Sequence, residues 1–301
     1  MRLKLLVLFL FLSSSTACLR SKLPLATTVQ QASTLFREKR YTECIPLYKD
    51  LAARTYQQGF YYYMTARAYA ALNDFPNCGK YLKKSIRYSP FYFKKYEDER
   101  QHFEGFLGSA QAREVNTFGI SQLGKHNWQV DSVLLKKVLA LSEQDQMFRK
   151  QIIAASRAND KVLYDSLRLL QQHIDTAVNT RFLALIAEKF PNYTNLGPEG
   201  ASVAMAILQH VPHDNKVQLL PIVKKQVDRH YLPYAVYANL YDRVRMEAGQ
   251  CQQYGTQQQI TDGKPCLYCV ENPSGLTERR AMIGLPPVDS SLSVCIKKAA
   301  H

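Results

Sequence analysis

The sequence lacks the features that mark several large classes of protein. Beyond Leu12, no apolar run approaches the roughly 20 residues that a helix needs to span a bilayer. The chain has no G-x-S-x-G nucleophile motif, no phosphate-binding glycine loop and no H-E-x-x-H metal motif. It also has no basic stretch interleaved with aromatic residues, so we expect no nucleic-acid partner. These absences argue against the common enzyme classes, and we predict no metal and no cofactor.

The composition is that of a folded protein. The 301 residues are 46% hydrophobic and 21% charged, which suits two domains of ordinary size and argues against disorder. The formal net charge is +14, and loss of the first 17 residues leaves 37 basic and 25 acidic residues, a net charge of +12. Such a charge either favours contact with anionic lipid or acidic envelope polymers, or reflects an ordinary solvated basic surface.

The first 17 residues have the layout of a secretory signal peptide. Arg2 and Lys4 give a positive start, an apolar run of LLVLFLFL follows, and small polar residues come next. The S-T-A-C segment that ends at Cys18 resembles a bacterial lipobox, although Ser15 stands where that motif usually has Leu. We predict a lipid on Cys18 and a linker over residues 18–24, with ordinary signal cleavage as the alternative. This implies a membrane-tethered lipoprotein of the bacterial cell envelope, periplasmic or surface-facing.

Residues 25–58 and 59–92 match each other at an offset of 34 residues. The aligned positions are all small, apolar or aromatic: Ala32 with Ala66, Leu35 with Tyr69, Tyr41 with Phe75, Cys44 with Cys78, and Tyr48 with Leu82. The second copy resembles a tetratricopeptide repeat, with small residues at Ala66 and Cys78 and a closing Pro90. The resemblance implies stacked helical hairpins, because one such hairpin cannot cover its own apolar face.

We expect this repeat module to cover residues 25–137, with a third degenerate hairpin or a capping helix after residue 92. Such repeats form concave surfaces that hold a protein or peptide partner. The aromatic runs Phe60 to Tyr63 and Phe91 to Tyr96 either line that groove or pack between the hairpins.

The remainder, residues 138–301, begins with helical periodicity. Apolar residues recur at steps of three or four from Leu163 to Leu185, which predicts a helix of about seven turns that ends before Pro191. Later helices are expected at 200–210, from Asn215 with Gln218 as its capping-box partner, and from Pro233 to Glu247. Periodicity stops after Gly249, and we predict an irregular C-terminal extension. The fold class is therefore all-α: tetratricopeptide-like hairpins followed by a helical domain with this extension.

The second half also resembles a bacterial domain family of unknown function, over roughly residues 139–290. The family is marked by a D-R-V segment, a glycine and then Q-x-Y-G-T-Q. The matching residues are Asp242, Arg243, Val244, Gly249, Gln252, Gln253, Tyr254, Gly255, Thr256 and Gln257, with further pieces at Asp145, Gln146, Arg149, Asp175, Asn179, His210, Asp214, Gln218, Arg279, Arg280, Gly284 and Leu285. The resemblance implies a fold and a cluster of polar residues, and no particular reaction, substrate or cofactor.

Two hypotheses explain that cluster. In the first it is a pocket, in which His210 is a general base, Asp242 orients it, and Arg243 clamps an anion. In the second the same residues tie the irregular extension onto the helices, because buried polar groups need partners. We favour the second. The candidate ligand-binding residues of the first are Gln253, Tyr254, Thr256, Gln257, Asp214 and Gln218.

The cysteines add a prediction about the extension. An exported chain can form disulfides, and the candidates are Cys251, Cys266, Cys269 and Cys295, with three possible connectivities for two bridges. Zinc binding by these cysteines, or by the His210–Asp214 segment, is the less favoured alternative. Cys44 and Cys78 occupy equivalent repeat positions and are expected to be packing residues.

Together these features predict a lipid-anchored envelope protein that acts as an interaction or ligand-binding module. Its partners would be a protein or peptide on the repeat module, the membrane through the lipid, and an envelope glycan or peptide as ligand. The alternative is an envelope hydrolase or other enzyme that uses a polar pocket of His210, Asp242 and Arg243.

Overall fold

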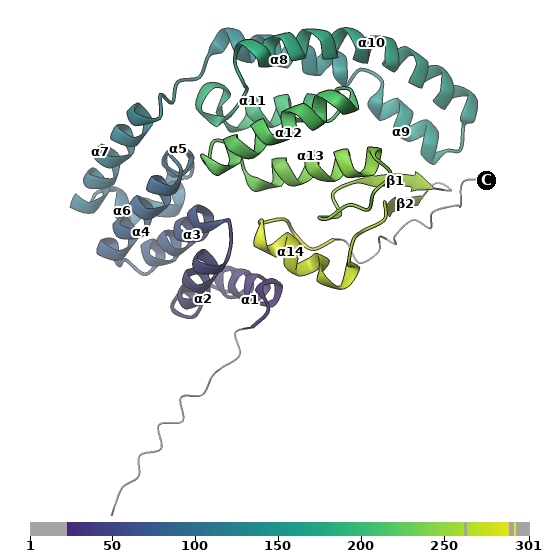
Figure 1. Ribbon diagram of the computed structural model, residues 1–301. Coiled ribbons are helices and arrows are strands. Elements are labelled where there is room, and N and C mark those ends of the chain that lie inside the picture. Colours follow the sequence, from purple (N-terminus) through teal and green to yellow (C-terminus); the bar gives the residue numbers. More distant parts are fainter. Residues whose placement is uncertain (1–22, 262–263, 289–291, 293–301) are drawn as a thin grey trace, which may run out of the picture.

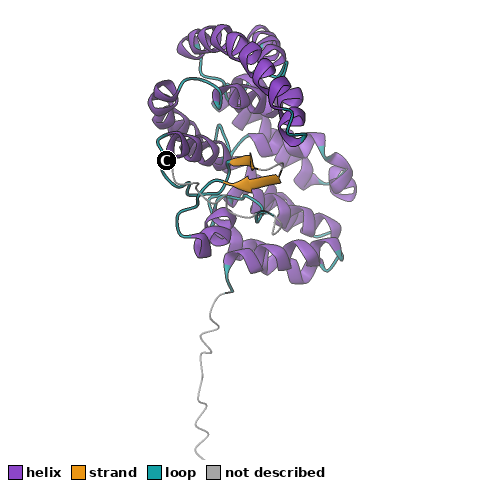
Figure 2. Ribbon diagram, turned by 90° about the vertical axis from the view of Figure 1, so that its right-hand side faces the viewer, coloured by secondary structure: helices purple, strands orange, loops and turns teal. Residues whose placement is uncertain are grey.

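The computed structural model describes residues 23–261, 264–288 and 292 (Figure 1). Within these residues the fold is all-α, as predicted, apart from one short two-stranded sheet (Figure 2). The predicted signal peptide, Cys18 and Cys295 lie outside the described residues. No helix in the described part of the chain combines the length and hydrophobicity needed to cross a membrane.

The N-terminal part consists of short helices, which we call the hairpin region. Its elements are α1 (Leu25–Arg37), α2 (Tyr41–Arg54), α3 (Gln58–Ala71), α4 (Phe75–Tyr88), α5 (Phe91–Asp98), the 3-10 turn η1 (Arg100–Phe103), α6 (Glu104–Leu107) and α7 (Ala110–Lys125). Each of the first four helices packs against the next, which gives the predicted helical hairpins. The turns of the first two hairpins have matching left-handed residues, Lys39 (φ 60°) and Asn73 (φ 58°).

Small residues allow the paired helices to approach closely. Ala32, Cys44, Ala66 and Cys78 all have an exposed fraction of 0%, and neither cysteine is in a disulfide. The aromatic runs serve mainly as packing: Tyr61 and Tyr63 of the first run and Phe93 and Tyr96 of the second are buried. Their rings fill the space between hairpins that the short, alanine-containing helices leave.

The second part forms its own core from longer helices. They are α8 (Ser132–Asp145), α9 (Arg149–Arg157), α10 (Lys161–Glu188), α11 (Tyr193–Leu208), α12 (His213–Asp228) and α13 (Tyr234–Glu247). Fully buried Val138, Phe182, Leu208, Val223 and Leu240 belong to this core. The long helix α10 is confirmed.

One local expectation about these helices is wrong, and the apolar stripe that predicted α10 is only partly buried. The apolar stripe of α10 is buried only toward its C-terminus, whereas Leu163 and Leu170 are 46% and 50% exposed. The capping box at Asn215 is absent, because α12 begins two residues earlier, directly after Pro212, and has no side-chain cap. Proline fixes a backbone angle that suits a helix start, so the helix forms without the predicted cap.

The C-terminal extension is more regular than predicted. β1 (Gln258–Thr261) pairs antiparallel with β2 (Lys264–Leu267), and the turn η2 (Pro273–Gly275) leads into α14 (Leu276–Met282). Helix α14 returns to the hairpin region and lies beside α1 (Figure 1). Glu278 accepts hydrogen bonds from the backbone N–H groups of Leu25 and Ala26, and Ala281 joins the core of the first hairpin. The C-terminal segment therefore covers part of the hairpin surface.

Candidate functional site

Asp242 on α13 holds the start of the C-terminal extension. Its carboxylate, which is 0% exposed, accepts hydrogen bonds from the backbone N–H groups of Gln253, Tyr254 and Thr256 at 2.7 to 3.1 Å. The Thr256 hydroxyl donates a further bond at 2.9 Å. Burial raises the pKa of Asp242, and the backbone hydrogen bonds oppose that rise. We call this arrangement the Asp242 anchor.

The glutamines of the extension seal the anchor. Gln252 is fully buried; its side-chain amide donates to the carbonyls of Gln257 and Tyr268 and accepts from the N–H of Gln257. The Gln257 amide donates to the carbonyl of Asn239 on α13. Tyr254 is only 8% exposed. These contacts fit the hypothesis that the polar cluster ties the extension onto the helices, because Tyr254 and Gln257 face protein and not solvent.

Two arginines of α14 complete the attachment of the extension. Arg280, which is 8% exposed, donates to the carbonyls of Tyr254 and Gly255 and to that of Pro286. Arg279 donates to the carbonyl of Gln253. The left-handed Gly255 (φ 62°) turns the chain so that these carbonyls point at α14.

His210 lies beside Asp145 and not beside Asp242. Its Nδ1 is 2.8 and 2.9 Å from the two carboxylate oxygens of Asp145, which ends α8 and is 1% exposed. The imidazole itself is 22% exposed. The orienting role that we predicted for Asp242 is thus geometrically available to Asp145, and the pair forms a His–Asp dyad.

The dyad belongs to a larger polar network. Arg149 bonds Asp145 and Asp175, each at 2.8 Å, and the Gln171 side chain donates to Asp175. Burial alone would raise the pKa of Asp145, but hydrogen bonds from His210 and Arg149 outweigh it and hold the pKa below its usual value. The network therefore joins family-like residues that lie far apart in the sequence, on α8, α9 and α10 and just after α11.

Arg243 lies on α13, and its buried Nε–H finds no acceptor among the residues that the structure describes. Burial lowers the pKa of Arg243, and Glu247 opposes that effect. Glu247 itself bonds Lys216 of α12 at 2.5 Å. Arg149 also acts on Arg243 as a nearby like charge, so the arginine sits at the edge of the dyad's network.

The remaining predicted ligand-binding residues do not join this network. Asp214 and Gln218 lie exposed on α12. His213, from the segment weighed as a metal site, pairs with Glu247 at 3.2 Å. Among the described residues, no group of three or more histidine, cysteine or acidic side chains has the arrangement of a metal site.

The cysteines of the extension form disulfides. Cys251 is bonded to Cys269, and Cys266 is disulfide-bonded as well. Three of the four candidate cysteines are thus disulfide-bonded in this structure, and the fourth, Cys295, lies outside the described residues. The bridge between Cys251 and Cys269 closes the loop that contains both strands.

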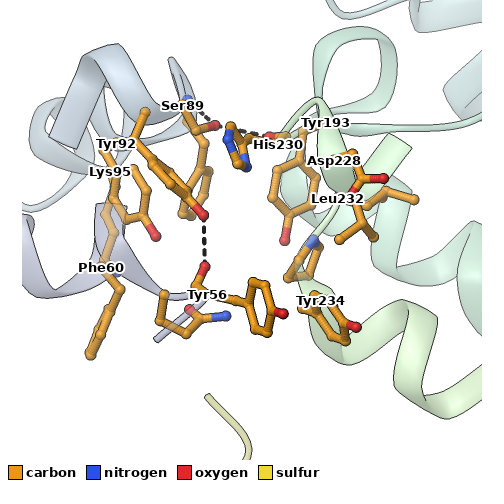
Figure 3. Close-up of a pocket in the computed structure, with 15 residues that line it drawn as sticks. Tyr56, Phe60, Ser89, Tyr92, Lys95, Tyr193, Asp228, His230, Leu232 and Tyr234 are labelled. Atoms are coloured by element: carbon orange, nitrogen blue, oxygen red, sulfur yellow. Dashed lines mark hydrogen bonds between the residues drawn. The ribbon is translucent and has the colours of Figure 1, made fainter. Parts of the chain in front are cut away.

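A cleft that the sequence did not predict lies between the hairpin region and the second part (Figure 3). Its volume is about 310 Å³. One wall comes from α3 to α5 and the facing wall from α11 to α13. The lining is Tyr56, Gln57, Phe60, Tyr88, Ser89, Phe91, Tyr92 and Lys95 on one side, and Tyr193, Val227, Asp228, His230, Leu232, Pro233 and Tyr234 on the other.

Direct contacts hold the two walls together. The Tyr88 and His230 rings stack with centroids 3.8 Å apart, and the Ser89 hydroxyl donates to the His230 carbonyl. At the other end, Tyr56 stacks on Tyr234 with centroids 4.9 Å apart. The left-handed backbone of His230 (φ 60°) directs this loop toward the hairpins. The two walls of the cleft are thus in direct contact at both ends.

The cleft is lined mainly by aromatic rings, and its tyrosine hydroxyls are protonated. Burial raises the pKa of Tyr193 to about 12 and that of Tyr92 further, so both phenols remain donors at neutral pH. Lys95 is paired with Glu99, and Asp228 with Lys224. Burial lowers the pKa of His230, with Asp228 opposing the change. The arrangement suits a ligand with apolar faces and hydrogen-bonding groups.

The sequence carried only a weak signal of this cleft. The aromatic runs of the hairpin region were noted, and their members Phe60, Phe91 and Tyr92 line it. The opposite wall comes from residues more than 100 positions later, which no local pattern joins to the first.

Comparison with known proteins assigns the second half of the chain to a protein family. The model of a family of unknown function (DUF6624) matches residues 132–298, more than half of the sequence. No curated protein and no solved structure matches the chain. The matched segment begins where α8 begins and includes the dyad, the Asp242 anchor and one wall of the cleft. The chain therefore belongs to this family of unknown function.

Proposed function

We propose that the protein is an exported, lipid-anchored envelope protein that binds an envelope peptide or glycan fragment in the aromatic cleft. The observation that carries this proposal is the cleft itself. It is concave, it is lined by aromatic side chains from both parts of the molecule, and its charged groups are already paired. Aromatic faces bind sugar rings and apolar side chains, and the phenol hydroxyls add hydrogen bonds.

The sequence resemblances support the same proposal. A tetratricopeptide-like hairpin module is an interaction scaffold, and here its surface is partly covered by α14 and partly turned toward the cleft. The signal-peptide layout and Cys18 favour a tether that keeps the cleft among cell-wall and envelope molecules.

Binding is tested with soluble cell-wall fragments that carry both sugar and peptide, and then with the sugar and the peptide separately, by calorimetry. Tyr56→Ala with Phe60→Ala removes two half-exposed rings from the cleft without opening the core. We expect about tenfold weaker binding or more, since aromatic anchors dominate such sites. Tyr164→Ala on α10, far from the cleft, is the matched control. Equal affinity of the cleft variant and the control would contradict the proposal, as would no binding by the wild type.

The tether is tested separately by fractionation of cells that express the Cys18→Ser variant. The lipid anchor predicts that the protein moves from the membrane to the soluble fraction. Unchanged membrane association of this variant rejects the anchor and leaves the cleft proposal intact.

A second function, envelope hydrolysis, is favoured by one observation, the His210–Asp145 dyad. An imidazole that is held by a buried carboxylate and is itself partly exposed has the geometry of a general base that deprotonates water. It is tested with the same fragments: mass spectrometry should detect a gain of water in wild type and none in His210→Gln. Binding without any cleavage by the wild type favours the first function.

A further inference from the structure

A second concave surface lies on the hairpin region, away from the cleft. It runs between α4 and α7, with a volume of about 460 Å³. Gly79 and Phe118 form part of its lining, and Glu114 contributes a carboxylate. We call it the basic groove because α4 supplies four cations to it: Lys80, Lys83, Lys84 and Arg87.

The helix repeat explains why these cations share one side of α4. Residues 80, 83, 84 and 87 are three, four and seven positions apart, and such spacing puts side chains on one face. The opposite face of α4 is buried in the hairpin core through Leu82 and Ile86. Helix α4 is thus strongly amphipathic, with an apolar buried face and a positively charged outer face.

Most of this charge has no carboxylate partner. Lys83 pairs with Glu114 at 2.9 Å. Within the described residues, Lys80, Lys84 and Arg87 form no ion pair and instead lie over aromatic rings. The Lys80 and Lys84 ammonium groups lie 5.9 and 5.2 Å from the centroid of Tyr81, and the Arg87 guanidinium lies 5.6 Å from that of Phe118.

Contacts with rings orient these cations without neutralising them. A folded protein gains little by concentrating unpaired like charges in a hollow, because they repel one another. An anionic ligand would remove that repulsion and find the cations already positioned, so less conformational entropy is lost on binding.

We propose that the basic groove binds a phosphate-rich polymer chain. Several cations in a row along one helix match a ligand with repeated negative charges better than they match a single small anion. The concave shape between two helices fits a chain, whereas a flat bilayer would reach only its rim. The site lies on different helices from those that carry the aromatic cleft's second wall, and the inference does not depend on the proposed function.

The test uses short inorganic polyphosphate as the probe, with binding measured by calorimetry on the whole protein. The groove variant is Lys80→Gln with Lys84→Gln and Arg87→Gln. The matched control, Lys136→Gln with Lys137→Gln and Lys150→Gln, removes three exposed cations from α8 and α9. We expect the groove variant to bind about tenfold to a hundredfold more weakly, since each cation near a polyanion contributes appreciably. The control should retain near-normal affinity.

Two further measurements, on a charge-preserving variant and on lipid vesicles, complete the test. Lys80→Arg with Lys84→Arg keeps the charge and should keep the affinity, which separates charge from damage to the fold. Equal losses in groove variant and control would show that only net charge matters and overturn the site. Failure of polyphosphate to bind the wild type overturns it too. Groove-dependent binding of phosphatidylglycerol vesicles with none of polyphosphate would overturn the polymer and assign the groove to the membrane surface.

Discussion

The hairpin region and the C-terminal extension are stabilised in opposite ways. In the hairpin region, buried rings and small residues such as Phe93, Phe106 and Ala66 fill the space between short helices. The extension has few buried apolar residues, and instead depends on the Asp242 anchor, the Gln252 amide, the arginines of α14 and a disulfide. Apolar burial is spread over many contacts, whereas a polar attachment concentrates stability in a few residues.

This contrast matters for function because the extension covers part of the hairpin surface and so limits which part of it a ligand can reach. Through Glu278 and the hydrogen bond from the Tyr56 N–H to the Met282 carbonyl, α14 is fixed on the hairpin surface next to the cleft. A change at the anchor should therefore act on the extension alone, and a change in the ring core should act on the hairpins.

The largest effect is expected for Phe106→Ala in the hairpin core. Phe106 is 0% exposed and contacts the rings of Phe75, Tyr96 and Phe103. Truncation leaves a cavity, and we expect the free energy of unfolding to fall by about 3–5 kcal/mol. Chemical denaturation monitored by circular dichroism measures this. A loss below about 1 kcal/mol would mean that the core collapses around the site and that the rings are not tightly packed.

The next effect is expected for Asp242→Asn, which preserves shape and replaces one acceptor oxygen with an amide donor. That NH2 group would face backbone N–H groups that now donate to the carboxylate. We expect a loss of about 2–4 kcal/mol in the stability of the extension, because buried donors are left without acceptors. The rate at which a protease cleaves the chain beyond Gly249 measures this loss of stability. Wild-type resistance to protease would contradict the proposed anchor.

A smaller change in stability is expected for alanine substitutions at two glycines of α7, and the two substitutions should have opposite signs. A Cβ at Gly119 would lie 2.2 Å from the Phe93 ring, so Gly119→Ala should destabilise by about 1–3 kcal/mol. A Cβ at Gly124 meets nothing within 4 Å, and Gly124→Ala should stabilise by about 0.5 kcal/mol. Thermal melts of the two variants compare them. The same sign for both would show that the close approach of α7 to α5 is absent.

The smallest effect is a pH dependence that arises in the cleft. Because burial lowers the pKa of His230, with Asp228 opposing, the folded protein binds fewer protons than the unfolded chain there. The contribution of His230 is therefore present above the unfolded pKa of about 6.5 and is lost as the pH falls toward the lower folded value. His230→Asn, which tolerates the left-handed backbone, should flatten this part of the stability profile. An unchanged slope between the two proteins would rule out His230 as its source.

Much of the fold was readable from local patterns. The 34-residue offset predicted the first hairpins, and small residues at Ala66 and Cys78 were correctly expected to be buried. The spacing of leucines predicted α10, and Pro233 marked the start of α13. These features depend on residues within a few turns of one another, which a sequence displays directly.

The errors about the site and the extension come from contacts between distant residues. The carboxylate beside His210 is Asp145, 65 positions away, while the closer Asp242 serves the extension. Periodicity did not predict β1, β2 or α14, because these segments are short. Their structure depends on the disulfides, the Asp242 anchor and contacts with α1. The cleft needs both halves of the chain, and only the aromatic runs of its first wall stand out in the sequence.

Hydrogen exchange on Asp242→Asn, followed by mass spectrometry, tests most directly whether one carboxylate holds the extension in place. If Asp242 holds the extension, exchange becomes faster over residues 250–261 and 264–288, while the buried hairpin helices α3 and α4 stay protected as in the wild type. Wild-type exchange in the extension, or an even loss of protection along the whole chain, would contradict it.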